Sequence, residues 1–478
     1  MNMGLFAAIP EIFVVIMIMV ILMVDAFISE KRASIATGLT LLTLFGGFIL
    51  QILVYNPEQP LLAFNNMFVL DPLAHGMKLL TYLASIVIVL YVKRYLIDNR
   101  LSRGVFYSIF LFAILGMLVM ISANNMLILY VGLELLSLAL YGLVALNNDH
   151  VKASEAAMKF FILGSLASGI LLYGISFIYG ASGGHLQLNN VLNAIYTSHA
   201  NSPIFVFGLV FIVAGLAFKL GLVPFHMWIP DVYDGASLAV TTIIGTVTKL
   251  AAIVFVLRFL ISGFAVLSHQ WALMFSVLAF LSIFLGNIAA IAQTNIKRML
   301  GYSTIAHMGF VAFGLACAST DGIVSLLFYI ITYVITALAG FGVLLFLSRD
   351  GFECENIDDL RGLNKLHPVY AGIMLLVMFS LAGIPPFVGF YAKFKILEAL
   401  IAVGYLKSAV FAVIMSLIGA FYYLRVVKVM YFDEPKLEIT PATVGVISRS
   451  VLTINGLLLL VLGILPGGLL LFCQHLIQ

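Results

Sequence analysis

The chain alternates between long apolar stretches and short polar segments from its first residues to its last. A helix of about 20 apolar residues is long enough to cross the hydrocarbon core of a bilayer. Polar residues, glycine and proline set the ends of the stretches. The pattern predicts an all-α integral membrane protein of about fourteen transmembrane helices, over residues 4–26, 34–54, 72–96, 104–122, 125–146, 153–180, 203–230, 236–262, 271–293, 297–318, 322–348, 368–401, 405–431 and 448–472.

The seventh and twelfth predicted helices are interrupted near their middles. Residues 222–226 read LVPFH, and residues 383–387 read GIPPF. Proline removes a backbone hydrogen bond, so both helices are predicted to break. Backbone carbonyls freed in this way are tolerated at membrane depth only where protein or a water-filled cavity surrounds them.

The two breaks lie five helices apart, which predicts an internal repeat. Because five is odd, a five-helix unit repeated in tandem is inverted in the membrane the second time, as in many transporters. We predict a single membrane domain over 1–478, with a three-helix segment at 1–103, a first repeat at 104–262, an inverted second repeat at 271–431 and a final helix at 448–472.

Composition supports a membrane environment. Hydrophobic residues make up 63% of the 478 residues and charged residues 9%, and the mean hydropathy is +1.16. A soluble domain could not cover that much apolar surface. The three cysteines lie far apart without a CxxC spacing, so they predict neither disulfides nor a zinc or iron–sulfur site. No Gly-rich phosphate-binding motif and no basic patch with interleaved aromatics occurs, so neither nucleotide nor nucleic acid is an expected ligand.

The distribution of Lys and Arg predicts the orientation. Most basic residues in or next to the connecting segments follow odd-numbered helices, whereas Lys407, at the start of the thirteenth helix, alone lies beside a connection that follows an even-numbered one. Because Lys and Arg are retained on the cytoplasmic side, the odd loops are predicted to be cytoplasmic. Both termini would then face the periplasm of a bacterium, with the chain in its inner membrane.

Several ionisable residues fall inside predicted helices. An ionised side chain in the hydrocarbon region costs at least about 2.5 kcal/mol, so each one needs a partner, a wet cavity or a function. Buried lysine, glutamate and histidine can bind and release protons near neutral pH. The candidates for a proton path are Glu134, Lys159, Lys219, His226, Lys249, His307 and Lys393.

Lys219 lies just before the first break and His226 seven residues later, which places both on one face if the helix is read as continuous. Glu134 could modulate the proton affinity of Lys219. The alternative for Glu134 is a static counter-ion that fixes helix packing. For the other candidates the alternative is a static hydrogen bond or a side chain that reaches the interface.

Other ionisable residues are assigned weaker roles. Only one of Lys393 and Lys395 can face a central path, because residues two apart point to different sides of a helix. Lys152, Glu155 and Lys159 follow a spacing typical of an interfacial ion-pair stripe, with Lys159 the deepest. Lys78, Arg258 and Glu398 are expected to reach the interface from helix ends. The acidic stretch 353–359 is expected to be a solvated loop.

Three segments carry a family resemblance. They are GLAFK at 215–219 leading to VPFHMW at 223–228, QTNIKRMLGYS at 293–303, and SLAGIPP at 380–386. The chain resembles the antiporter-like membrane subunits of respiratory complex I, the proton-pumping NADH:quinone oxidoreductase. It is more distantly similar to the subunits of Mrp-type cation/proton antiporters. The resemblance extends over essentially the whole length.

Within that family, WIPDVYDGA at 228–236 is similar to the N-type subunits, the bacterial counterparts of mitochondrial subunit 2. Lys393 and the lack of an extended C-terminal lateral helix point the same way. The resemblance implies a polar axis of Glu134, Lys219, Lys249 and Lys393, with His226 and His307 as relays. It also implies that this chain holds no redox centre: FMN, iron–sulfur clusters and quinone belong to partner subunits, among them other antiporter-like subunits.

Two other functions are considered. A free-standing sodium/proton antiporter should place clustered acidic and carbonyl ligands at mid-membrane, whereas here lysine predominates and Glu134 is nearly alone. A non-conducting scaffold subunit would tolerate neutralisation of Lys219, Lys249 and Lys393 in pumping but lose stability of assembly. Protons, carried by buried side chains and water, are the favoured cargo.

Overall fold

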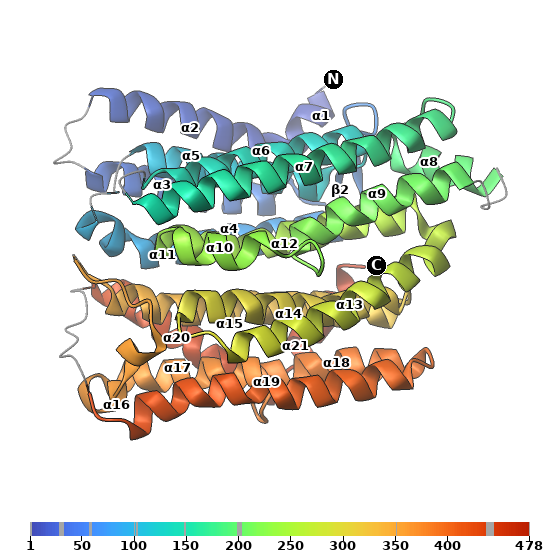
Figure 1. The fold of residues 1–478 in the computed structure, drawn as a ribbon. Helices are drawn as coiled ribbons and strands as arrows, with labels where there is room; N and C mark the ends of the chain where they lie inside the picture. Colours follow the sequence, from blue (N-terminus) through green and yellow to red (C-terminus); the bar gives the residue numbers. More distant parts are fainter. Residues whose placement is uncertain are drawn as a thin grey trace.

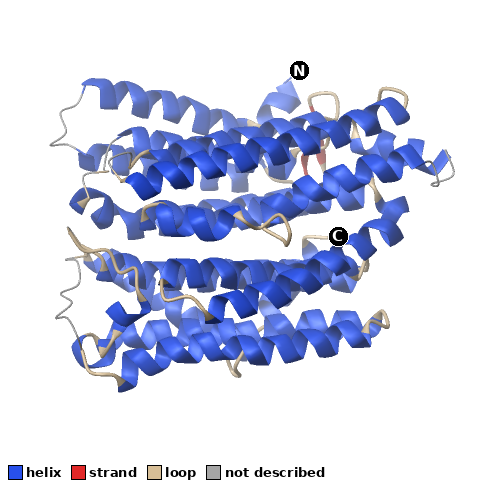
Figure 2. Ribbon diagram, in the orientation of Figure 1, coloured by secondary structure: helices blue, strands red, loops and turns tan. Residues whose placement is uncertain are grey.

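The computed structural model describes residues 2–27, 33–56, 60–99, 101, 104–147, 150–197, 203–349, 351–435 and 444–477. These residues form a bundle of long, roughly parallel helices (Figure 1). The N-terminal half, blue to green, lies beside the C-terminal half, yellow to red. Helix makes up nearly all of the described chain, with one short strand pair (Figure 2).

The elements alternate between long helices and short connecting ones. In the N-terminal half the helices are α1 (Asn2–Ala7), α2 (Ile9–Phe27), α3 (Ala33–Val54), α4 (Pro72–Asp98), α5 (Gly104–Ser122), α6 (Met126–Ala145), α7 (Val151–Ala181), α8 (Leu188–Thr197), α9 (Pro203–Leu220), α10 (Trp228–Gly235), α11 (Leu238–Gly245) and α12 (Val247–Leu257). The strands β1 (Leu61–Ala63) and β2 (Phe68–Leu70) pair antiparallel between α3 and α4.

In the C-terminal half the helices are α13 (Ser268–Ile291), α14 (Ile296–Ala316), α15 (Thr320–Leu347), α16 (Leu363–Leu366), α17 (Pro368–Ala382), α18 (Val388–Ala402), α19 (Leu406–Phe432), α20 (Val446–Ile464) and α21 (Gly467–His475). The short helices η2 (Arg258–Gly263, a π-helix), η3 (Ala265–Leu267) and η4 (Ile357–Leu360) complete the described elements.

The predicted multi-helix membrane fold is confirmed. Within the described residues, thirteen helices or helix runs are long and apolar enough to cross a membrane. The remaining predicted crossing is the broken pair α17 and α18, whose halves are each shorter than a full span. The predicted final helix, 448–472, is divided into α20 and α21 at Leu465 and Pro466.

Both predicted breaks are present and end their helices in the same way. After α9, Gly221 takes a φ of +80°, and after α17, Gly383 takes a φ of +83°. At each break the N–H groups of the glycine and of the next residue bond back to one carbonyl, that of Ala217 in α9 and that of Phe379 in α17. This is the glycine stop that ends many helices. The inverted repeat and the domain boundaries remain predictions, and this matched geometry agrees with them.

The eighth predicted helix contains a break that the sequence did not indicate. α11 ends at Gly245 and α12 begins at Val247, with Thr246 between them at a φ of −125° and a ψ of −91°. The Lys249 amide then bonds to the Thr246 carbonyl at 3.0 Å. The kink therefore lies less than one turn before a predicted site lysine.

Two residues expected to reach the interface are instead buried ion-pair partners. Lys78 in α4 is fully buried and pairs with Glu11 of α2. Arg258, at the start of η2, forms two hydrogen bonds to Asp71, at 2.6 and 2.7 Å. Burial of Asp71 opposes ionisation, but the Arg258 guanidinium dominates and holds the pKa of that carboxyl below its usual value. The expectation was wrong because tertiary partners on distant segments satisfy these charges.

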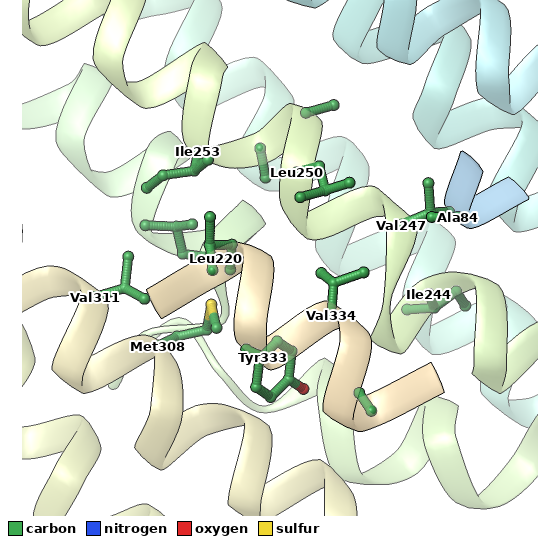
Figure 3. Close-up of a cluster of buried hydrophobic side chains, with 14 of the residues drawn as sticks. Ala84, Leu220, Ile244, Val247, Leu250, Ile253, Met308, Val311, Tyr333 and Val334 are labelled. Carbon is green, nitrogen blue, oxygen red and sulfur yellow. The ribbon is translucent and has the colours of Figure 1, made fainter. Parts of the chain in front are cut away.

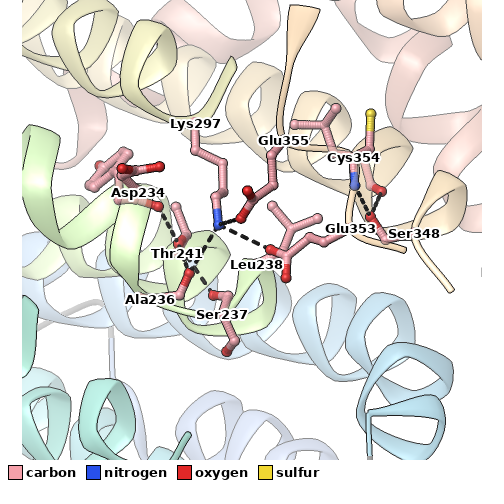
Figure 4. Close-up of polar contacts among 12 residues, drawn as sticks. Asp234, Ala236, Ser237, Leu238, Thr241, Lys297, Ser348, Glu353, Cys354 and Glu355 are labelled. Atoms are coloured by element: carbon pink, nitrogen blue, oxygen red, sulfur yellow. Dashed lines mark hydrogen bonds and ion pairs between the residues drawn. The ribbon is translucent and has the colours of Figure 1, made fainter. Parts of the chain in front are cut away.

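The acidic stretch 353–359 is not a freely solvated loop. Lys297, at the start of α14, is almost fully buried and bridges Glu353 and Glu355, each at 3.1 Å (Figure 4). Its ammonium also donates to the Ala236 carbonyl at 3.3 Å. Between the two glutamates Cys354 is buried, which raises the pKa of its thiol. This segment fastens the C-terminal half to the α10–α11 connection.

The glycine stop after α9 gives a test of the break. In a Gly221→Ala variant, the new methyl would carry the strain of a positive φ, worth about 1 kcal/mol or more, and would lie 2.0 Å from the Ile229 Cδ1 atom. We expect a lower thermal unfolding temperature in detergent. Gly372→Ala is the control, because that glycine lies within α17 with open space around it. Equal unfolding temperatures for the two variants would contradict this account.

Candidate functional site

The predicted lysines gather at the broken helices. Lys219 lies in the last turn of α9, and its Nζ donates to the Ser137 hydroxyl of α6 at 2.6 Å. Lys249 of α12 is 1% exposed, and its Nζ lies 3.5 Å from the Leu220 carbonyl at the end of α9. The carbonyl end of a helix attracts positive charge. The break after α9 therefore places a carbonyl group beside Lys249, while Lys219 bonds to a hydroxyl.

A cavity of about 30 Å³ joins these two lysines. Ser137, Thr248 and Trp228 also line it, and the Lys249 ammonium lies 5.6 Å from the centre of the Trp228 ring. The Trp228 indole N–H donates to the Phe218 carbonyl at 3.0 Å and so fixes the ring across the break. Most of the other lining side chains are apolar, but the ammonium and hydroxyl groups give water hydrogen-bonding partners, and a space of this size can hold about two water molecules.

Glu134 lies on the neighbouring helix, half-buried, one turn before Ser137. It accepts a hydrogen bond from the Ser168 hydroxyl of α7. Among the described residues, no ion pair within 4.0 Å joins it to Lys219. The structure thus brings Glu134 near Lys219, with Ser137 between them on the same helix face, rather than into direct contact with it.

A second cluster forms at the break after α17. The Lys393 ammonium donates to the Leu381 carbonyl at 3.0 Å, the Ala382 carbonyl at 2.9 Å and the Ser416 hydroxyl at 2.8 Å. Lys395 turns the other way and pairs with Glu398 at 2.7 Å on the partly exposed face of α18. Of the two lysines, Lys393 is therefore the one that faces the interior.

His307 of α14 lies beside this lysine, buried between two tyrosines. Its Nδ1 atom is 2.7 Å from the Tyr329 hydroxyl, and its Nε2 atom is 3.0 Å from the Tyr423 hydroxyl. The Tyr423 hydroxyl is also 2.5 Å from that of Ser303. Two cavities of about 10 Å³ meet at His307, and one of them is lined by Lys393 as well. Each is close to the volume of a single water.

An apolar layer lies between the two clusters (Figure 3). On one side, Leu250 and Ile253 follow Lys249 along α12, and on the other, Met308 and Val311 follow His307 along α14. Val334 of α15 fills the space between these helices. All of these side chains are buried. The layer also includes Tyr333 of α15, whose hydroxyl lies 2.8 Å from that of Thr304, so it is mostly rather than wholly apolar. The polar groups around Lys249 and around His307 line different cavities.

Two predicted site residues lie away from the cavities. α9 ends at Leu220, so Lys219 and His226 do not share a helical face, and that prediction was wrong. His226 is half-buried in the connection before α10 and does not line the cavity between the lysines. Lys159 of α7 is 43% exposed and pairs with Glu155 at 2.7 Å and with Asp231 at 2.9 Å.

The partner of Lys159 belongs to an ion-pair cluster around α10. Asp231 also pairs with Arg298 of α14 at 3.0 Å, and Asp234 accepts a hydrogen bond from the Asn295 side chain at 2.8 Å. These contacts join α10, which begins at the cavity residue Trp228, to α7 and to α14. The cluster therefore fixes the position of one cavity wall.

The residues that sequence reasoning missed are mainly hydroxyl groups. Ser137, Ser416, Tyr329 and Tyr423 all bond to predicted lysines or to His307. One partial signal was present, because Ser137 follows Glu134 by three residues and so shares its helical face. Tyr423 and Ser416 lie far from His307 in sequence and could not be paired with the site from spacing alone.

The fold and the site define a polytopic membrane protein whose buried lysines lie at helix breaks beside small polar cavities. In the described part of the chain, no group of three or more His, Cys, Asp or Glu residues is arranged to hold a metal ion. Residues 123–419 match the model of the family described as "NADH:quinone oxidoreductase/Mrp antiporter, TM". The chain belongs to this family.

Relatives that match over the full length show which kinds of subunit the chain is similar to. NADH-quinone oxidoreductase subunit N of Laribacter hongkongensis (strain HLHK9) is 51% identical over 478 residues, which cover 100% of this chain and 98% of the relative. A chain of respiratory complex I from Thermus thermophilus is 30% identical with a TM-score of 0.80, covering 96% of this chain and 98% of that one. A chain of the Mrp complex from Dietzia sp. DQ12-45-1b shares the fold, with a TM-score of 0.83, 20% identity and coverage of 99% and 96%.

The histidine cluster gives a test with two tyrosines of α19. Tyr423→Phe removes the hydroxyl that contacts both His307 and Ser303 but keeps the ring, so we expect proton transport by the assembled protein to fall several-fold. Tyr431→Phe is the control, because Tyr431 lies about two turns further along α19 and lines neither cavity at His307. Transport is measured as acidification of membrane vesicles. Equal rates for the two variants would contradict a role for the His307–Tyr423 contact.

Proposed function

We propose that this chain acts as an N-type membrane subunit of NADH:quinone oxidoreductase and moves protons across the membrane, driven by redox chemistry in other subunits. The observation that carries the proposal is the placement of Lys219, Lys249 and Lys393 at two helix breaks, each lining a small polar cavity. The similarity to subunit N over the full chain supports the same reading.

The proposed path uses each cluster as a place where a proton is held. In the first cluster, a proton passes between Lys219 and Lys249 through water in their shared cavity, and Glu134 stabilises the charged form of Lys219. In the second, His307 and its tyrosines exchange protons with Lys393. His226 and Lys159 lie away from the cavities, so the structure gives less support to a role for them in the path. Their roles remain predictions.

The apolar layer between the clusters has a role in this proposal. If water connected the two regions permanently, protons would leak back down their gradient. Because the layer contains closely packed side chains of α12, α14 and α15, a proton crosses it only when the redox reaction elsewhere changes that packing or the charge beside it. Transport is then coupled to electron transfer.

The electron carriers are proposed to lie on partner chains. This chain would hold no redox centre of its own, with FMN, iron–sulfur clusters and quinone bound by other subunits of the complex. Its neighbours would include other antiporter-like membrane subunits. We further propose that it lies in the bacterial inner membrane with both termini in the periplasm, as the distribution of Lys and Arg indicates.

An Mrp-type cation/proton antiporter is the second candidate function, favoured by the shared fold. The chemistry of the cavities argues against a sodium site. Sodium is a hard cation like calcium and prefers several oxygen ligands, but the ammonium groups of Lys219, Lys249 and Lys393 line these cavities and would repel it. Sodium dependence of transport would favour the antiporter.

Variants of two neighbouring lysines distinguish a proton path from a non-conducting scaffold. Lys393→Met removes the ammonium that faces the second cluster and keeps similar length, so we expect NADH-driven proton pumping by the intact complex in liposomes to fall several-fold. Lys395→Met is the matched control, because that ammonium faces outward toward Glu398. We expect its pumping to stay near that of the unchanged complex.

Assembly is followed in the same preparations by the yield and thermal stability of the complex. Unchanged pumping in an assembled Lys393→Met complex, together with reduced stability, would favour the scaffold reading and overturn the proposed path. Loss of pumping with normal assembly supports it.

A further inference from the structure

The N-terminal three-helix segment contains buried charge outside the residues matched by the family model, which begin at residue 123. Glu11 of α2 pairs with Lys78 of α4, and the two side chains are 8% and 0% exposed. Neither residue lines the cavities described above. An ion pair this well enclosed is expensive to bury, and it calls for a structural or a chemical role.

Several polar atoms around this pair lack partners. Among the described residues, the Glu11 Oε2 atom, the Gln51 Oε1 atom and the Tyr82 hydroxyl are buried without a hydrogen bond. They come from α2, α3 and α4, the three helices that pack around the pair. Buried polar atoms in native proteins are nearly always satisfied, often by water. Three orphaned atoms beside one ion pair therefore mark a site that accommodates water or an extra proton.

A line of buried polar groups leads away from this site along α3. Thr37, Thr40, Thr43 and Gln51 are all buried and lie within about a third of the helix circumference. Between Thr43 and Gln51, Gly47 allows the Tyr82 hydroxyl to approach, since a Cβ there would lie 2.8 Å from it. From residue 37 to residue 51 the helix rises roughly 21 Å, so the line covers most of the membrane thickness.

Both ends of this polar column have hydrogen-bonding groups. At one end, the Thr37 hydroxyl donates to the Tyr107 hydroxyl of α5 at 2.8 Å. At the other, the Gln51 amide lies 3.3 Å from the His75 Nδ1 atom, three residues before Lys78. Hydroxyl, amide and imidazole groups can pass protons with the help of water when they are arranged one after another in space.

The charged end of the column also faces the first repeat. The Asp71–Arg258 pair lies next to it, on the residue that precedes α4 and on η2. Arg258 continues the same membrane span as Lys249, nine residues further on, roughly 13 Å along the axis. The groups around Glu11 and Lys78 are thus Gln51 from α3, His75 and Tyr82 from α4, and the Asp71–Arg258 pair.

We propose that Glu11 and Lys78 form a further proton-holding site, at one end of a polar column through the three-helix segment. When a proton passes from the Lys78 ammonium to the Glu11 carboxylate, both groups become neutral. The Glu11 carboxyl then releases this proton to a water molecule, and the free amine accepts the next proton from a hydronium ion, which restores the ion pair. The site adds a route beside the one through the lysine clusters, and it rests on the proposed function of the chain in proton transport. A static anchor between α2 and α4 is the competing role.

The two roles differ in what happens when both charges are removed. Breaking a buried ion pair by neutralising one partner is costly, whereas removing both partners is nearly neutral for a pair that serves only packing. We therefore compare Glu11→Gln, Lys78→Met and the double variant in the intact complex in liposomes. Thermal stability, NADH oxidation and protons pumped per NADH are measured for each.

A proton-holding site predicts that the double variant regains stability relative to the single variants but pumps fewer protons per NADH than the unchanged complex. A static anchor predicts that the double variant regains both stability and the full proton yield, which would overturn the proposal. If the single variants do not assemble, the double variant alone decides between these outcomes.

The column is tested separately with two threonines. Thr43 and Thr453 each donate to the carbonyl four residues earlier, at 2.8 and 3.0 Å, but Thr43 is buried in the column and Thr453 is exposed on α20. We expect Thr43→Val to lower the proton yield and Thr453→Val to leave it unchanged. A full yield in Thr43→Val would exclude the column.

Failure of the site at Glu11 and Lys78 can be distinguished from failure of the proposed path through the lysine clusters. If Lys393→Met lowers pumping while Glu11→Gln and the double variant do not, the site at Glu11 and Lys78 is rejected and the proposed function stands. If Lys393→Met has no effect, the proposed function itself fails.

Discussion

A positive charge inside an apolar helix bundle needs acceptors, and broken helices supply them here. The carbonyl ends of α9 and α17 stop in the interior because Gly221 and Gly383 end the helices. Lys249 lies beside the Leu220 carbonyl, and Lys393 binds the carbonyls of Leu381 and Ala382. The same carbonyls would be unsatisfied without the lysines, since water is scarce at this depth. Break and lysine therefore stabilise each other.

This arrangement keeps an ammonium group in the bundle without a permanent ion pair. A carboxylate in direct contact would favour the charged lysine strongly and hinder release of its proton. Carbonyl and hydroxyl partners are weaker. Lys219 bonds to Ser137, and among the described residues no ion pair joins it to Glu134. Small cavities beside each lysine leave space for one or two waters. In the proposed mechanism, this space is enough for proton exchange but too small for a continuous channel.

Ion pairs at the ends of the bundle have a different role. Lys297 with Glu353 and Glu355, Asp231 with Arg298, and Asp71 with Arg258 each join segments far apart in sequence. They fix α10, the start of α14 and η2 relative to the rest of the fold. Such pairs limit which helices can move relative to one another.

The sequence alone determined the membrane fold, the two helix breaks and the lysines beside them. These are local signals: apolar runs of fixed length, a glycine or proline at one position, and a charge where hydrocarbon is expected. The break at Thr246 has only a weak signal, because the preceding Gly245 is a lone glycine in an apolar helical pattern, and such a glycine does not by itself predict a break. The sequence also did not indicate which residues pair with the buried charges. Lys78 and Arg258 looked like interfacial residues until Glu11 and Asp71 were placed beside them, and His226 left the helical face of Lys219 because the chain turns at Gly221. Which hydroxyl meets which lysine or histidine depends on contacts between different helices, over sequence separations of 22 to 116 residues. These contacts, and with them the positions of the cavities and the apolar layer, are decided only by the tertiary structure.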